Sequence, residues 1–243
     1  MLLALCLHAQ QAPGFDVASI HPHAPDDIRF LVHMPVNGQF SASGIAAKLA
    51  IMLAFDVQDS QIIGGPDWLA TEKWDIDAKC DDQQRHSADE TRGMLQKLLA
   101  DRFLLRLHRE TQQRPAYVLT LARSGPKFQH AREEEATNIR VTTSSVRLEA
   151  GDLARLAQVL ATSLGRPVVD RTGLGGRYDL FPQWDDAPIA KGGVPGLDTP
   201  AAPGADHGSI FTAIQDQLGL RLEPQRVPVE VIVIDRMERP SAN

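Results

Sequence analysis

Four side chains in this sequence have the chemistry to bind a ligand: Trp68, Trp74, Asp170 and Arg177. The two tryptophans follow a Gly-Gly-Pro loop, where indole rings can stack on sugar rings or hold a peptide. The alternative is that both rings fill the core between a helix and a strand. We therefore treat these four residues as candidate ligand-binding residues and assign no catalytic residue.

The motif Asp170-Arg-Thr-Gly resembles the phosphorylated aspartate loop of P-type ATPases and the Asp-Thr-Gly of aspartic proteases. Such an ATPase also needs nucleotide-binding and membrane segments, and this sequence contains neither. An aspartic protease needs an unbroken motif supplied twice, so that two carboxylates share one proton. The motif instead predicts a turn in which Asp170 and Thr172 cap the backbone and Gly173 takes a positive φ.

Three histidines near the N-terminus, His21, His23 and His33, occur close to Asp26 and Asp27. Imidazole and carboxylate groups suit zinc, so these residues could converge on a metal. Their spacing matches no known zinc motif, and a proline separates the first two histidines. A solvated loop is therefore favoured, and we assign no metal ligand.

Motifs for the commoner enzyme chemistries are missing from the sequence. It contains no Gly-x-Ser-x-Gly nucleophile motif, no P-loop and no Gly-x-Gly-x-x-Gly fingerprint. Cys80 has no sequence neighbour that indicates a paired base, so it is not a predicted nucleophile. We expect no cofactor.

The composition is that of a globular protein, with 43% hydrophobic and 23% charged residues in a chain of 243. The net charge is -6 and the basic residues are not clustered. Because binding to phosphate backbones needs concentrated lysine and arginine, a nucleic-acid partner is not expected. After the first residues, no apolar stretch approaches the roughly 20 residues of a membrane span.

Residues 1–12 are an apolar run that ends in small and polar residues, without a positive start. This pattern resembles the second half of a secretory signal peptide, and the alternative is a buried first strand. We expect a partial signal peptide and a protein that is exported to the periplasm or the exterior.

Four segments have apolar residues at three- and four-residue spacing, which predicts amphipathic helices. Ser87 and Glu90 have the spacing of a capping box, and Asp152 and Ser209 can each cap a further helix. The predicted helices lie in 43–55, 87–103, 152–164 and 209–218. The first is expected to bury Ile45, Leu49, Met52 and Leu53.

Short β-branched or alternating segments between the helices predict strands. In the strand that contains Asp75 and Asp77, alternation places both carboxylates on one face, where we expect them to be solvated. The other predicted strands are 15–20, 28–33, 106–108, 117–122, 139–143, 146–148, 178–181 and 229–234.

The two halves of the chain carry the same elements in the same order. In each half a helix and a turn lead to an aromatic-Asp-aliphatic strand, which begins at Trp74 or at Tyr178. Each half then has a helix, Leu-Arg-Leu, a loop and a strand that starts with proline. This order predicts an α+β fold of two pseudo-repeated units, each with two helices packed on a mainly antiparallel sheet.

The expected domains are a first α+β unit over residues 13–135 and a second over 136–243. They meet near the charged stretch 132–138, which has no apolar periodicity. Within the second unit, residues 185–208 are rich in proline and glycine, which predicts a mobile surface loop.

Six motifs occur in this sequence in the same order as in one known family. They are Gly64-Gly-Pro-Asp-Trp-Leu, Asp75-Ile-Asp-Ala-Lys, Leu98-Leu-Ala-Asp-Arg-Phe, Leu107-His-Arg-Glu-Thr, Gly165-Arg-Pro-Val-Val-Asp-Arg-Thr-Gly-Leu and Gly176-Arg-Tyr-Asp-Leu. Over residues 15–243 the chain resembles the soil-associated (Soli-type) exported proteins of unknown function that are expanded in Acidobacteria. The resemblance implies export and supplies no catalytic residues. Some relatives are joined to a membrane metallopeptidase of the β-lactam-sensor type, which implies an envelope or sensing role for those relatives. The sequence has no transmembrane segment, so the resemblance does not transfer that role.

These observations favour an extracytoplasmic binding or interaction module over an enzyme. We expect an envelope protein, a peptide or a glycan to bind at a sheet edge or in a cleft between the two units. An edge strand can accept an extended segment of a partner. One alternative is a cell-envelope hydrolase, which a deep cleft holding close carboxylates or a Ser-His pair would favour. The other is a sensor module that acts with a membrane metallopeptidase.

Overall fold

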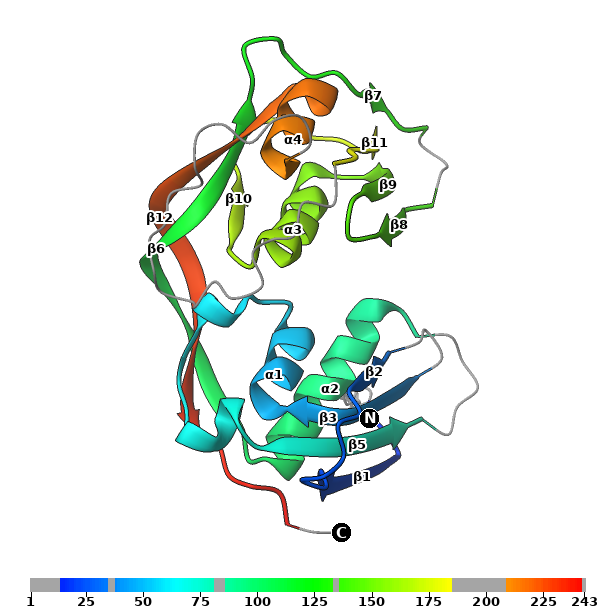
Figure 1. Ribbon diagram of the computed structural model, residues 1–243, viewed down its shortest axis with the longest axis vertical. Helices are drawn as coiled ribbons and strands as arrows, with labels where there is room; N and C mark the ends of the chain where they lie inside the picture. The colour runs from blue at the N-terminus through cyan, green and yellow to red at the C-terminus, as the bar shows by residue number, and fades with distance from the viewer. Residues whose placement is uncertain (1–13, 35–37, 81–85, 133–135, 185–208, 242–243) are drawn as a thin grey trace, which may run out of the picture. The chain divides into compact units, whose positions relative to one another are not determined.

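A computed structural model describes residues 14–34, 38–80, 86–132, 136–184 and 209–241. The expected leader, 1–12, and the expected loop, 185–208, lie outside the described residues. Within them the chain forms four α-helices and three four-stranded sheets that are mostly antiparallel (Figure 1). The predicted α+β class is therefore confirmed.

The contacts divide the chain into two compact units. Unit 1 consists of Met1–Arg109 and Ile232–Asn243, and unit 2 consists of Glu110–Val231. Two long strands, β6 (Arg106–Leu121) and β12 (Leu220–Arg236), contribute residues to both units. The end of β12 thus belongs to unit 1, together with residues 1–109.

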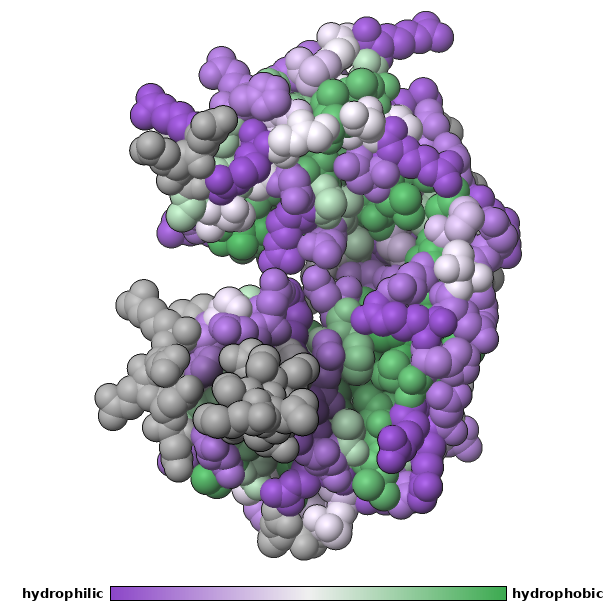
Figure 2. Space-filling view, turned by 180° about the vertical axis from the view of Figure 1, so that it is seen from behind, coloured by the Kyte–Doolittle hydropathy of each residue, from purple (hydrophilic) through white to green (hydrophobic). Residues whose placement is uncertain are grey.

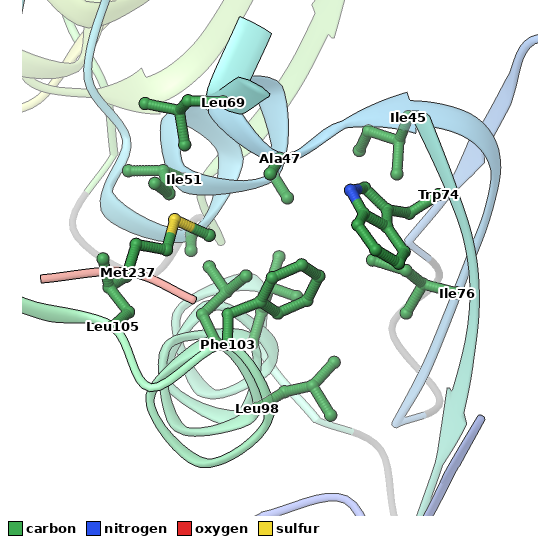
Figure 3. Packing of buried hydrophobic residues seen from close by; sticks show 14 of the residues in the cluster. Ile45, Ala47, Ile51, Leu69, Trp74, Ile76, Leu98, Phe103, Leu105 and Met237 are labelled. Carbon is green, nitrogen blue, oxygen red and sulfur yellow. The ribbon is translucent and has the colours of Figure 1, made fainter. Parts of the chain in front are cut away.

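Unit 1 contains a sheet in the order β1-β5-β3-β2, in which neighbouring strands are antiparallel. Two helices pack with this sheet around the unit's core (Figure 3). The core gathers side chains from both helices and from the end of β12, because each element has one apolar face to bury. The elements are β1 (Val17–Pro22), β2 (Leu31–His33), β3 (Gln39–Ala46), α1 (Ala47–Phe55), the 3-10 turns η1 (Asp59–Gln61) and η2 (Asp67–Ala70), β5 (Lys73–Lys79) and α2 (Ala88–Arg102).

The predicted start of α2 is confirmed, because Ser87 and Glu90 form a capping box. The Ser87 backbone N–H donates to Glu90 Oε2 at 2.7 Å, and the Glu90 N–H donates to Ser87 Oγ at 3.2 Å. Together these bonds satisfy two backbone donors that the first helical turn leaves without an intrahelical partner.

The first predicted helix is wrong at its start. Residues from 39 to 46 form β3 instead, because pairing with β5 supplies backbone partners that a helix start at residue 43 would forgo. The helix begins at Ala47, and the residues that it buries are Ala47, Ala50, Ile51 and Ala54. The predicted inward residues Leu49, Met52 and Leu53 are only partly buried.

Unit 2 contains a sheet in the order β7-β11-β9-β8 with two helices. The predicted caps of both helices are confirmed, since Asp152 accepts the Arg155 N–H and Ser209 accepts the Thr212 N–H. The elements are β7 (Gln129–His130), β8 (Asn138–Val141), β9 (Val146–Gly151), α3 (Leu153–Leu164), β11 (Tyr178–Leu180) and α4 (Ile210–Leu218).

The loops expected before the two proline-initiated strands are wrong. Each segment is part of one unbroken strand, β6 or β12, in a third sheet with the order β10-β6-β12-β4. Backbone pairing between the two long strands keeps their central residues in extended conformation, although the polar side chains there are exposed. Many hydrophilic side chains lie over β6 and β12 (Figure 2). The short outer strands β10 (Val168–Asp170) and β4 (Ile62–Gly64) pair in parallel with their neighbours.

Candidate functional site

The outer face of the sheet in unit 1 carries a group of carboxylates, hydroxyls and imidazoles. Along β5 the side chains of Trp74, Ile76 and Ala78 are buried, whereas Asp75 and Asp77 point to the other face. The prediction that the two carboxylates share a face is therefore confirmed. The expectation that both carboxylates are solvated is not confirmed, because Asp75 lies under a loop.

Asp75 is the acceptor at the centre of this network. Its Oδ1 atom accepts hydrogen bonds from His23 Nδ1 at 2.8 Å, from Ser43 Oγ at 2.9 Å and from the Gly44 N–H at 2.9 Å. Burial alone would raise the pKa of Asp75, but the bonds from Gly44, His23 and Ser43 outweigh it and lower the pKa. Asp75 is therefore held as a carboxylate.

The imidazole of His23 bridges two oxygen atoms. While Nδ1 faces Asp75, Nε2 lies 2.8 Å from the backbone carbonyl oxygen of Asp27. The His23 side chain is only 3% exposed. The hydrogen bond to Asp75 and then the bond to the Asp27 backbone raise the pKa of His23, and burial opposes them. Both partners are acceptors, so the geometry matches the doubly protonated ring.

The Gly44 backbone explains why the loop fits closely on the sheet. Gly44 lies in a β-bulge of β3 with φ +67°, which aims its N–H at Asp75. A Cβ atom at this position would lie 2.5 Å from the carbonyl oxygen of Arg29. Glycine is therefore required both by the bulge and by the loop that covers it.

Within the same loop, Asp27 and Arg29 form a close ion pair. The Arg29 Nε atom donates to both Asp27 oxygens, at 3.0 and 2.8 Å, and the Arg29 N–H donates at 2.9 Å. These bonds lower the pKa of Asp27 to about 2. The two charges of the pair offset each other, and Asp26 beside them is an exposed carboxylate.

A second row of polar residues crosses the sheet from β1 to β2. The register aligns Ser19, Asp77, Ser41 and His33, one from each strand. Ser41 Oγ donates to Asp77 Oδ1 at 2.7 Å, so the serine hydroxyl proton points to a carboxylate and not to an imidazole. A Ser-His-Asp catalytic site needs the opposite order of contacts. Among the described residues, no group of three or more His, Cys, Asp or Glu side chains is placed to hold a metal ion.

The edge of this sheet is apolar and open. β2 is the last strand in the sheet order, and within the described chain its one strand neighbour is β3. Leu31, which begins β2, is 58% exposed, and Ile28 and Phe30, in the segment just before the strand, are 96% and 63% exposed. Exposed apolar side chains grouped beside unpaired strand backbone are typical of an interaction surface.

Unit 2 also has a bulge whose N–H is accepted by a carboxylate. Asp179 Oδ1 on β11 accepts the Ala150 N–H on β9 at 2.9 Å, and Ala150 has φ +46°. On the outer face of this sheet lies a hollow of about 370 Å³. Its lining residues are Ala136, Arg147, Glu149, Asp179 and Phe181. The Arg147 guanidinium lies over the Phe181 ring at 4.5 Å and pairs with Glu149 at 2.8 Å.

Two of the predicted ligand-binding residues lie in the core of unit 1. Trp68 and Trp74 are 9% and 4% exposed, and their rings meet edge-on at 6.4 Å. Figure 3 shows Trp74 directed inward, among Ile45, Ile76 and Phe103. The packing alternative accounts for both positions, and their ligand-binding role stays a prediction.

The other two predicted ligand-binding residues form hydrogen bonds with other groups of unit 2. Asp170 Oδ1 accepts the Thr172 N–H at 2.9 Å and its hydroxyl at 2.8 Å, and Gly173 has φ +71°, which confirms the predicted turn. Arg177 Nε donates to the Ala150 carbonyl oxygen at 2.9 Å. A ligand for either side chain stays a prediction.

The apolar edge residues were not predicted as a site. Residues 28–33 were expected as a strand, but the sequence has no signal for which strand is outermost in a sheet. The link between His23 and Asp75 spans 52 positions and was likewise not predicted.

Fold and site together define a two-unit α+β protein with an open apolar sheet edge and no recognised catalytic constellation in its described residues. Residues 48–237 match the family of proteins of unknown function designated DUF3738, so the chain belongs to that family. No curated protein and no solved structure matches the chain. None of the helices in the described part has the length and apolar character that crossing a bilayer requires.

Proposed function

We propose that this chain is a protein-interaction module that binds an extended, apolar segment of a partner polypeptide as an additional strand beside β2. The observation that carries the proposal is the exposed apolar group formed by Ile28, Phe30 and Leu31 at the edge of the sheet. Strand addition uses the backbone of an edge strand for affinity and adjacent side chains for specificity. Export to the cell envelope, expected from residues 1–12, is part of the same proposal.

The chemistry of this edge favours an uncharged partner segment. Three exposed apolar side chains follow closely in the sequence there, and of the nearby charges Asp27 pairs with Arg29, which leaves only the carboxylate of Asp26. A charged side chain opposite them would lose hydration without gaining a partner. Alternating aliphatic residues in the partner would bury the most surface.

Other outer strands carry features that oppose strand addition. β1 ends in Pro22, which has no backbone N–H, and β8 carries Arg140. Proline and charge are common ways of protecting a sheet edge. β2 has no proline, lysine or arginine, which supports it as the preferred edge.

Replacing Leu31 with lysine is expected to weaken binding of an extended peptide at least about tenfold, or about 1.4 kcal/mol. The probe is a short fluorescent peptide of alternating valine and threonine with an arginine at each end, titrated by fluorescence anisotropy. The lysine removes apolar contact and adds a charge at the edge. The matched control is Val17→Lys, on β1 at the opposite edge, because Val17 and Leu31 are similarly exposed at 51% and 58%. Equal weakening by both variants, or none by Leu31→Lys, would contradict the proposal.

We also propose that the two halves of the chain are diverged copies of one module. The sheet orders β1-β5-β3-β2 and β7-β11-β9-β8 correspond strand for strand. Each copy would contain an aspartate, Asp75 or Asp179, that accepts the N–H of a positive-φ residue in the neighbouring strand, Gly44 or Ala150. An experimental structure in which the sheets β1-β5-β3-β2 and β7-β11-β9-β8, with their helices, cannot be superposed would refute duplication.

A further inference from the structure

The side chain of His23 forms hydrogen bonds that connect the segment between β1 and β2 to the sheet. His23 follows β1 directly, and its ring bonds to Asp75 on β5 and to the Asp27 carbonyl in the loop, both at 2.8 Å. The His23 backbone N–H also donates to the Lys73 carbonyl oxygen at 2.9 Å. The exposed residues Ile28 and Phe30 lie a few positions further along this segment.

The two ring contacts require two N–H donors. Neither a carboxylate nor a carbonyl oxygen can donate, so each ring nitrogen must carry a proton for both bonds to form. A neutral imidazole has one N–H. Its other nitrogen then presents a lone pair to an oxygen, and one of the contacts is lost.

We infer that His23 is a protonation-dependent latch, which holds residues 24–30 against the sheet and so fixes the apolar side chains beside β2. In the protonated state both contacts are made. After deprotonation the remaining proton stays on the nitrogen that faces the Asp75 carboxylate, because a bond to a charged acceptor is stronger than one to a carbonyl. The Asp27 carbonyl is released, and the loop that carries Ile28 and Phe30 loosens.

The charged groups around the ring favour the closed state. Asp75 faces it from β5, and Asp27, with its partner Arg29, lies in the loop. From β3 come only uncharged donors to Asp75, the Ser43 hydroxyl and the Gly44 N–H. His21, on β1, is paired in register with Asp75, and it is exposed.

The direction of the pH effect follows from the raised pKa of His23. A group whose pKa is higher in the folded state stabilises that state fully below its unfolded value, near 6.5. The stabilisation is lost as the pH rises through the folded pKa. The latch is therefore closed at low pH and opens as the pH increases.

Hydrogen–deuterium exchange of the full-length chain tests the latch without any ligand. Measured from about pH 5 to about pH 9 and corrected for intrinsic rates, protection of residues 24–30 should fall as His23 deprotonates. The imidazole signals of His23 should titrate over the same range by NMR. In His23→Gln, protection of the segment should be low throughout, whereas His21→Gln should behave like the wild type. Protection that does not change with pH in the wild type overturns the latch.

A second variant opens the latch and keeps the histidine. Gly44→Ala would place a methyl group 2.5 Å from the Arg29 carbonyl oxygen. Gly44 also has φ +67°, where a side chain is strained, so the methyl group is disfavoured by the bulge as well as by the loop. Protection of residues 24–30 should be lost at every pH, while protection of α2 should persist and show that unit 1 is folded. Unchanged protection of the loop would contradict the proposed contact.

The consequence for binding depends on the strand addition proposed above. If the closed loop is the binding-competent state, affinity for the valine-threonine peptide should fall by up to about tenfold per pH unit above the His23 pKa. Affinity that is unchanged by pH, with protection that falls, refutes this consequence of the latch. If the peptide does not bind at any pH while protection falls, strand addition fails and the latch stands.

Discussion

Replacing Phe103 with alanine is expected to lower the free energy of unfolding by about 3–5 kcal/mol, the largest effect of any single change considered for this protein. Phe103 is 0% exposed and joins the last turn of α2 to two aromatic rings. Its ring centroid lies 6.5 Å from that of Trp68 and 5.6 Å from that of Trp74. Alanine would leave a cavity that the stiff indole rings cannot fill by small movements (Figure 3).

Urea unfolding followed by tryptophan fluorescence measures this effect. The chain has three tryptophans, and a Trp184→Phe background leaves the two that contact Phe103 as reporters of unit 1. Phe30→Ala is the control within unit 1, because Phe30 is 63% exposed and its loss should change stability by less than about 1 kcal/mol. Similar losses for the two variants would mean that the aromatic cluster does not hold unit 1 together.

Replacing Asp75 with asparagine is expected to cost about 2–3 kcal/mol, allowing for a side chain that is 36% exposed. The substitution keeps the shape of the side chain and removes the charge that accepts from His23, Ser43 and Gly44. The new amide group also offers N–H donors where the network needs an acceptor. Equilibrium unfolding at neutral pH gives the cost directly.

The pH profile of the same variant identifies the charge as the cause. Because the pKa of Asp75 is lowered in the folded state, its contribution is present above the unfolded value and is lost as pH falls through the folded one. Wild-type stability should therefore decrease below about pH 4, and Asp75→Asn should decrease less steeply there. If the free energy of unfolding falls equally steeply with decreasing pH in the wild type and in Asp75→Asn, this role is contradicted.

Asp179→Asn provides the matched comparison in unit 2. Asp179 also accepts a bulge N–H, from Ala150, but the described residues place no imidazole against it. Its replacement should cost about 1 kcal/mol, the typical value for one hydrogen bond. The difference between the two variants then measures what His23 and Ser43 add to the bulge in unit 1.

In the proposed model, the sheet edge binds a partner and the protonation state of His23 controls that binding. Ile28, Phe30 and Leu31 supply apolar contact, and His23 determines how firmly the segment that carries two of them is held. A hydrolase receives less support, because Ser41 donates to a carboxylate on a sheet surface and not to an imidazole in a deep cleft. Binding and latch are measured by separate experiments, so each can fail alone.

The sequence by itself determined the features that depend on near neighbours. The caps at Ser87, Asp152 and Ser209 were predicted correctly, because each uses a backbone N–H three positions later. The Asp170 turn was also predicted, since Thr172 is two positions away. The α+β class followed from alternation and helical spacing, which are properties of single segments.

Only the tertiary structure decided the features that depend on distant partners. Residues 39–46 form a strand because β5 lies beside them, and β6 and β12 are continuous because each pairs along the other. Local propensity cannot reveal such pairing, since the backbone partner is far away in the sequence. The same holds for the site: His23 meets Asp75 across 52 positions, and β2 is an edge only because of the order in which the strands assemble.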